Sequence, residues 1–412
     1  MELLAAVFLS VALWLPGVGS IQQSDLPPLP PPFCGELTEA DCQLLTDSQD
    51  VMRGVSSMEM SLGVNASVAG IPDVADEDMV FDMNTDMTLH FDPALNEQLR
   101  AMALRSPEEL LATQEEFGQL IVDLYATMAM RLEMDMSMPK LLRDAIEQDE
   151  GVILPATIPV AIRMVNGYLY IDMDTLADSF PELRDAMASD GIQGWVGMDL
   201  AGQLRQDLLS SGVASDASAM QSLQLGVVFN QLMADEAMRN LLEPHVTVER
   251  LDDEVRDGAP VAIFRTTIEL GDMVSNPNFT RLLRQAAESM IAASGERVDS
   301  QELGAGILAV QLLANVLARA YEFEVVQSVG VDTPYVYDYS IYLQLDLSGL
   351  LALAAMGGEE LPPELSGAQP VFTFDMNASY GAFNDAPAVE APENAQILPL
   401  DSMDQDSLDV IS

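Results

Sequence analysis

Residues Val371 to Ala395 read VFTFDMNASYGAFNDAPAVEAPENA, and they are the most informative segment of this chain. In its first half, apolar and polar side chains alternate, and the apolar positions are Phe372, Phe374, Met376, Ala378 and Tyr380. This period of two predicts a strand with one buried face and one wet face. An Asn-Asp turn follows at Asn384, and Val389 then lies between two prolines.

This strand, with the YGAFNDAPAVEAPENA that completes it, resembles the closing segment of the LolA/LppX-like superfamily of extracytoplasmic lipid-carrier proteins. Members of that family often end in a similar strand, a short φ-N-x-P-V-x-φ-x-P stretch and the chain terminus. The resemblance implies a curved sheet whose covering helices enclose an apolar cavity for acyl chains.

The same alternation recurs at 58–68, 81–91, 128–138 and 335–345. One-sided alternation is typical of antiparallel strands with one covered face, and we expect about nine or ten of them. Two hairpins are predicted, one at Asn166-Gly167 and one at Asp257-Gly258. In the first hairpin, pairing Val165 with Tyr168 brings the apolar sides of both strands into register.

Helical spacing is found at 36–52, 218–243, 275–293 and 301–321. The last of these segments is apolar nearly all round, but polar residues interrupt it, so we expect a buried helix lying on the sheet. The predicted fold class is α+β, a large, curved, half-barrel-like antiparallel sheet with helices packed on one face. A single domain is expected over 36–395, and its two hairpins suggest similar halves at about 55–180 and 245–385.

The charge balance excludes several classes of partner. The chain has 17 Lys and Arg against 66 Asp and Glu, and its formal net charge is −49. Nucleic acid and basic attachment to an anionic membrane are therefore excluded, because both need clustered cations. Hydrophobic residues nevertheless make up 49% of the chain, which is enough for a large folded core.

The N-terminus has the pattern of an export signal. An apolar run at 3–15 and the small residues Val18-Gly-Ser20 predict a cleaved signal peptide over 1–20, with a buried N-terminal helix as the alternative. No lipid-attachment cysteine follows, so an unlipidated periplasmic or extracellular protein is expected. A Pro-rich linker is assigned to 21–35 and an acidic tail to 396–412.

Cys34 and Cys42 are the only cysteines. In an exported chain such a pair predicts a disulfide, and two free thiols are the alternative.

No catalytic or metal-binding pattern is present in the sequence. The two histidines, His90 and His245, are isolated and are interpreted as solvated or capping residues. Carboxylate pairs such as Asp172 and Asp174 lack the spacing of a calcium loop and are interpreted as a solvated acidic face. No cofactor, metal site or transmembrane span is expected, and the protein is predicted not to be an enzyme.

The candidate ligand-contacting surface is rich in methionine. One side of the 128–138 segment carries six apolar residues, five of them methionine: Met128, Met130, Leu132, Met134, Met136 and Met138. Flexible, polarisable Met side chains suit a wall that contacts acyl chains, and they equally suit an ordinary core. The hypothesis is an exported, non-enzymatic protein that binds or carries a lipid or another apolar ligand between sheet and helices. The alternative is a secreted structural or protein-interaction scaffold whose core is fully packed.

Overall fold

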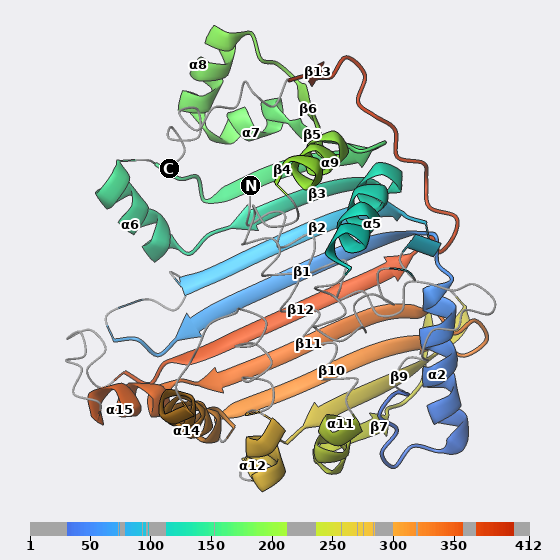
Figure 1. The fold of residues 1–412 in the computed structure, drawn as a ribbon, viewed down its shortest axis with the longest axis vertical. Coiled ribbons are helices and arrows are strands. Elements are labelled where there is room, and N and C mark those ends of the chain that lie inside the picture. The colour runs from blue at the N-terminus through green and yellow to red at the C-terminus, as the bar shows by residue number, and fades with distance from the viewer. Residues whose placement is uncertain are drawn as a thin grey trace.

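The structure is a computed structural model that describes residues 31–72, 74, 79–92, 94–95, 98, 113–151, 153–211, 236–256, 258–269, 271–274, 276–282, 284, 300–318, 320–356 and 368–398. A single sheet organises these residues, and helices lie over one of its faces (Figure 1). The predicted N-terminal signal and most of the predicted linker fall outside the described residues.

The sheet has 13 strands in the order β13-β6-β5-β4-β3-β2-β1-β12-β11-β10-β9-β7, and β8 pairs with β9. The strands are β1 (Ser57–Ala69), β2 (Val80–His90), β3 (Ala129–Ser137), β4 (Thr157–Val165), β5 (Tyr168–Asp172), β6 (Trp195–Asp199), β7 (Val246–Arg250), β8 (Glu254–Arg256), β9 (Ala259–Ile268), β10 (Tyr321–Gly330), β11 (Val336–Asp346), β12 (Val371–Gly381) and β13 (Gln396–Ile397). The principal helices are α2 (Glu39–Arg53), α5 (Gln114–Thr127), α6 (Lys140–Glu150), α7 (Met173–Ser179), α8 (Pro181–Asp190), α9 (Leu200–Ser211), α11 (Glu236–Leu242), α12 (Gly271–Val274), α14 (Ser300–Leu317) and α15 (Ser348–Met356).

The predicted fold class is confirmed. Every strand pair is antiparallel except β13 with β6, and the curved sheet is not closed, because its two terminal strands do not pair with each other. Strands from the N-terminal and C-terminal parts of the chain pair in the middle of the sheet, since β1 lies between β2 and β12. Met60 of β1, for example, lies opposite Met87 on one side and Tyr380 on the other.

Both predicted turns are present. Val165 pairs with Tyr168 and Ile162 with Ile171, the register expected from the sequence. Asn166 and Gly167 have φ values of 55° and 83°, as a two-residue hairpin turn requires. In the second hairpin Arg256 lies opposite Ala259, and Gly258 has a φ of 84°.

Two expectations need correction. The helix predicted over 301–321 ends earlier, and Tyr321 begins the strand β10, which was not predicted. The short strands β6 and β13 were not predicted either. The helix itself forms as α14 but is not buried. Leu308 is 59% exposed and Leu312 is 54% exposed. α14 is exposed because it contacts α12 and α15 at the ends of the strands and does not lie flat on the sheet (Figure 1).

The N-terminal segment is fastened to the β7 edge of the sheet. Cys34 and Cys42 form the predicted disulfide, with 5.4 Å between their Cα atoms. Gly35, inside this loop, lies against the backbone of β7, where an added Cβ would be 3.4 Å from the Val248 nitrogen. Asp41 forms an ion pair with Arg250 at the end of β7. The loop therefore covers a strand edge that would otherwise be free to pair.

The C-terminal segment after β12 runs along the ends of the strands. Residues 382–395, here called the C-terminal strap, follow the strand ends from β12 towards β13 (Figure 1). The Asn384 side chain accepts a hydrogen bond of 2.7 Å from the Ser56 N–H. Phe383 stacks on Tyr335 with 4.3 Å between ring centroids. Gln396 and Ile397, assigned to the tail from sequence, pair with β6.

Candidate ligand-binding face

The sheet has an inner face towards the helices and an outer face away from them. The register places apolar side chains in rows across the inner face. Towards the C-terminal strap these rows are closely packed, and α2 and α11 contribute Leu45, Met52 and Leu241 to the same core. The buried strand residues of this packed part include Met58, Met60, Met87, Leu89, Met130, Leu132, Ile162, Met164, Ala378 and Tyr380.

Towards the other end of the strands the inner face is covered less completely. One row consists of paired residues from five neighbouring strands: Phe81, Ala66, Phe374, Leu343 and Phe323. Each of these residues is half-buried. The next row outward is half-buried too, and it contains Val68, Phe372, Leu345 and Tyr321. We call these two rows the open rows. Large apolar side chains in the middle of a wide sheet are thus left partly uncovered.

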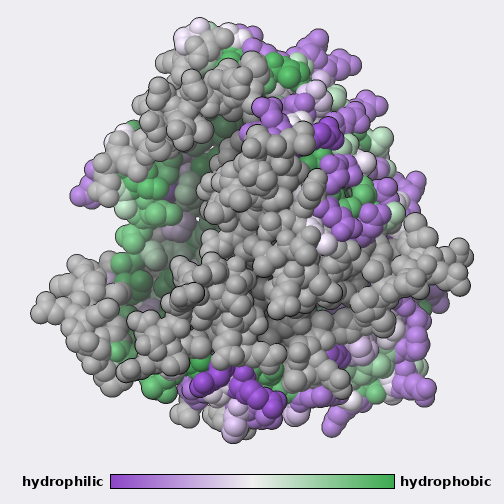
Figure 2. Space-filling view, viewed as in Figure 1, coloured by the Kyte–Doolittle hydropathy of each residue, from purple (hydrophilic) through white to green (hydrophobic). Residues whose placement is uncertain are grey.

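The space-filling view supports this description. Figure 2 shows hydrophobic surface within a hollow on the left of the view, the side on which Figure 1 places α6 and the end of β3. The hollow therefore lies on the same side as the open rows.

The structure buries three of the six candidate residues and leaves the other three half-buried. Met130 and Leu132 are each 4% exposed and Met134 is 9% exposed, so all three lie in the packed part of the inner face. Met136 is half-buried and lies opposite Met83, beside the open rows. Met128 is the C-cap of α5, and Met138 follows the end of β3, so neither belongs to the strand. The role of these six as cavity lining stays a prediction.

Sequence reasoning missed the residue that most needs a partner, Thr85. It is 5% exposed, lies opposite Met134 on the inner face, and its Oγ1 atom has no hydrogen-bond partner. A buried hydroxyl without a partner costs free energy, so it requires an explanation. The alternation of β2 marks it as an inward threonine, but only the three-dimensional structure shows that its hydroxyl is unpaired.

Thr85 belongs to a row with further polar groups. Register across four more strands continues through Leu62, Ala378 and Tyr339 to Gln327. We call this row the boundary row, because it is the last row of the packed part. One further row, through Met83, Val64 and Met376, lies between it and the open rows. Burial raises the pKa of the Tyr339 phenol, which keeps it neutral. The boundary row thus presents a hydroxyl, a neutral phenol and an amide to an otherwise apolar face.

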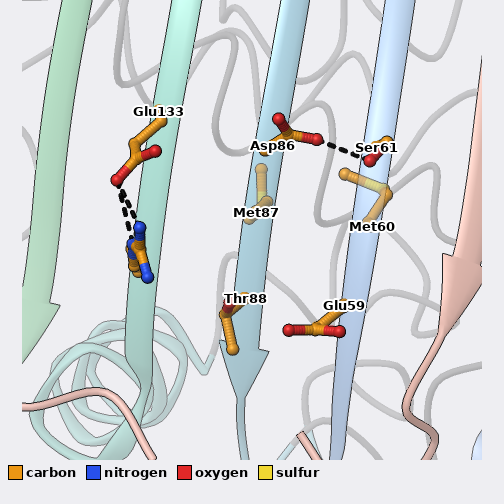
Figure 3. Close-up of a pocket in the computed structure, with 8 residues that line it drawn as sticks. Glu59, Met60, Ser61, Asp86, Met87, Thr88 and Glu133 are labelled. Atoms are coloured by element: carbon orange, nitrogen blue, oxygen red, sulfur yellow. Dashed lines mark hydrogen bonds and ion pairs between the residues drawn. The ribbon is translucent and has the colours of Figure 1, made fainter. Parts of the chain in front are cut away.

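The outer face is polar and has open depressions. The one in Figure 3 has a volume of about 330 Å³ and is lined by Glu59, Ser61, Asp86, Thr88, Arg131 and Glu133, with parts of Met60 and Met87. Ser61 Oγ donates to Asp86 Oδ1 at 2.5 Å, and Arg131 pairs with Glu133 at 2.6 Å. A second depression of about 310 Å³ lies on the same face near Asn377. Charged linings of this kind do not suit an apolar ligand.

The histidines and paired carboxylates have structural partners or positions. His90 Nε2 is 2.9 Å from the Pro387 carbonyl oxygen of the C-terminal strap, and His245 ends a short 3-10 helix. Asp172 caps α7, and Asp174 accepts from the Gly194 N–H at 3.0 Å. Across the residues that the structure describes, no group of three or more His, Cys, Asp or Glu is arranged to hold a metal ion.

Comparison with known proteins adds little beyond overall likeness. No protein-family model and no curated protein matches the chain. The solved lipoprotein LppX from Mycobacterium tuberculosis aligns with 84% of this chain and 97% of its own, at 9% identity and a TM-score of 0.26. LprF from Mycobacterium bovis aligns with 86% and 97%, at 8% identity and a TM-score of 0.31. At these values neither structure indicates a function, and the function proposed below is inferred from the side chains of this chain alone.

Within the described part of the chain, no helix is long and apolar enough to cross a membrane.

Proposed function

We propose that the open rows bind a lipid or another elongated apolar ligand, and that the protein is an exported, non-enzymatic carrier or binder. The observation that carries this proposal is the half-burial of the open rows, whereas the packed part of the same face is closed. Exposed apolar area is unfavourable in water by roughly 25 cal/mol per Å². A ligand that covers these side chains would remove this apolar area from water, and its binding would be stabilised by that amount.

Thr85 supports the same proposal independently. Its unpaired hydroxyl is buried in the boundary row, one row beyond Met83, so a ligand that extends from the open rows past Met83 would end beside it. A carbonyl or hydroxyl group on the ligand could pair with it. The Cys34–Cys42 disulfide agrees with the exported location, because disulfides persist in oxidising compartments.

The test uses neighbouring positions on β1 that face opposite ways. Ala66→Trp fills the open row between Phe81 and Phe374, whereas Ser67→Trp places the same side chain on the outer face. Displacement of a fluorescent fatty acid and native mass spectrometry with lipid extraction measure binding. We expect Ala66→Trp to weaken binding at least roughly tenfold, since its indole takes up the space of several ligand carbons. Ser67→Trp should bind like the wild type. Equal binding by both variants, or none by the wild type, contradicts the proposal.

The packed part of the inner face favours a second candidate, a scaffold with a full core. Thr85→Val separates the two functions, because it keeps the shape and removes the unpaired hydroxyl. Both predict a gain in the free energy of unfolding of about 1 kcal/mol for the ligand-free protein. Only the carrier predicts a simultaneous loss of affinity for a ligand that hydrogen-bonds there. Met134→Trp should cost about 1–3 kcal/mol in either case, because Met134 lies in the packed part.

A further inference from the structure

Helices α14 and α15 form an apolar corner at one end of the sheet, and we use this name for the pair. The helices touch closely, since a Cβ added to Gly349 of α15 would be 2.6 Å from Val316 Cγ1 of α14. Among the α14 residues whose burial the structure describes, Ile307 is the buried one. The helix exposes four large apolar residues: Leu308, Val310, Leu312 and Leu313.

The corner contrasts in charge with the rest of the chain. Glu302, in the first turn of α14, is the one charged residue of the two helices; residues 303–317 and α15 (Ser348–Met356) contain none, although the whole chain has 66 carboxylates. Residues 276–282 and 284 lie beside α14, because Gln311 of α14 bonds to Thr280. This segment carries two exposed arginines, Arg281 and Arg284, and no carboxylate. A protein with this many negative charges can approach the apolar interior of a bilayer only through a surface with few carboxylates. Arginines beside that surface can bind the phosphates of lipid headgroups.

The apolar corner is continuous with the open rows. α14 leads into β10 at Tyr321 and Phe323, and α15 directly follows β11, which ends beyond Leu343 and Leu345. The two strand ends are joined by a hydrogen bond of 2.8 Å from the Asp346 N–H to the Ala320 oxygen. Figure 1 shows both helices at the same end of these strands. An acyl chain leaving a surface that touches the corner would thus meet apolar side chains all the way to the inner face.

We propose that the apolar corner docks on a phospholipid bilayer and is the entrance through which acyl chains reach the open rows. A second copy of the chain is a less suitable occupant, because two molecules of net charge −49 repel each other. The transfer step rests on the proposed function, whereas docking does not. For the same electrostatic reason, we expect stronger docking on neutral than on anionic bilayers at low salt.

The experiment compares the wild type with Leu308→Asp/Leu312→Asp in flotation with phosphatidylcholine vesicles. Both leucines are more than half exposed, so the fold should tolerate the changes, and circular dichroism checks this. Val255→Asp is the matched control, since Val255 is 75% exposed and lies on β8, away from the corner. We expect the vesicle partition coefficient to fall at least roughly tenfold for the double variant and to stay unchanged for the control.

Each outcome decides the proposal. Absence of wild-type binding to vesicles, or an equal loss in the Val255→Asp control, overturns it. A wild-type dimer that the double variant dissociates in analytical ultracentrifugation, without vesicle binding, assigns the corner to self-association and also overturns it. Binding of a soluble fatty acid without vesicles is measured in parallel. If that binding fails while flotation succeeds, the carrier function is wrong and docking stands. If it succeeds in both proteins while flotation fails, docking alone is wrong.

Discussion

Gly167 shows how one residue can be required for two separate reasons. Its φ of 83° is strained for any side chain, and an added Cβ would lie 2.7 Å from the Ala201 Cβ. Gly258 has nearly the same φ but nothing within 4 Å of such an atom. We expect Gly167→Ala to lower the free energy of unfolding by more than Gly258→Ala, which should cost about 1 kcal/mol through backbone strain alone.

Urea denaturation of the two glycine variants measures this difference. The excess loss in Gly167→Ala reports the contact between the β4–β5 turn and α9. Equal losses would show that the turn moves away from Ala201 without cost, and the close approach would then be unimportant for stability.

Asp41 lies in the first turn of α2, bonds to the N-cap residue Thr38 and forms a partly buried ion pair. Its side chain accepts from Thr38 Oγ1 at 2.7 Å and pairs with Arg250, and it is almost completely buried. The hydrogen bond from Thr38 and then the guanidinium of Arg250 lower the pKa of this carboxyl below its usual range, although burial opposes the shift. A carboxyl with a lowered folded-state pKa stabilises the fold above its unfolded value and loses that contribution as the pH falls.

Asp41→Asn should therefore destabilise the protein by about 1–3 kcal/mol at neutral pH. Its difference from the wild type should shrink as the pH drops below the usual Asp value of about 3.9. Asp50→Asn is the control, because Asp50 forms an exposed pair with Arg53 that should contribute less than about 1 kcal/mol. A difference from the wild type that stays constant down to pH 2 would contradict the assignment. Thermal unfolding across pH measures both variants.

At the scale of elements, period-two alternation located the long strands because each has one covered face. β1, β2, β3, β11 and β12 were predicted nearly to their ends for this reason. β10 was missed because the apolar helix before it continues into Tyr321 and Phe323 without a turn residue. β13 was missed because two residues cannot establish a period, and only the neighbouring β6 defines it.

The candidate site was predicted less well than the fold. The methionine side of β3 was identified correctly as inward-facing, but sequence could not distinguish its packed part from its open end. That distinction depends on how far the helices extend over the sheet. The open rows also combine residues from β1, β2, β10, β11 and β12, which come together only through pairing of distant strands. Thr85 could be placed on the correct face, yet the lack of a partner for its hydroxyl is a property of the assembled core.

At the scale of the whole molecule, the charge of −49 should make stability depend on salt. Screening weakens repulsion among exposed carboxylates, so we expect the Tm to rise between roughly 50 mM and about 1 M NaCl. Choline chloride at equal ionic strength is the control, since its cation does not coordinate carboxylates. A Tm that is flat or falls would show that the acidic surface is already compensated. A rise with sodium alone would indicate specific cation binding.

The pairing of β1 with β12 also constrains the order in which the protein can fold. Ser56 and Asn384, which bond beside this pair, are 328 positions apart in the chain. A growing polypeptide makes β1 early, and the partner for one of its edges is synthesised last. Contacts of such long separation form slowly because a large loop must close first. Chains that stop before Val371 should therefore leave an unpaired edge in the middle of the sheet, and we expect them to aggregate.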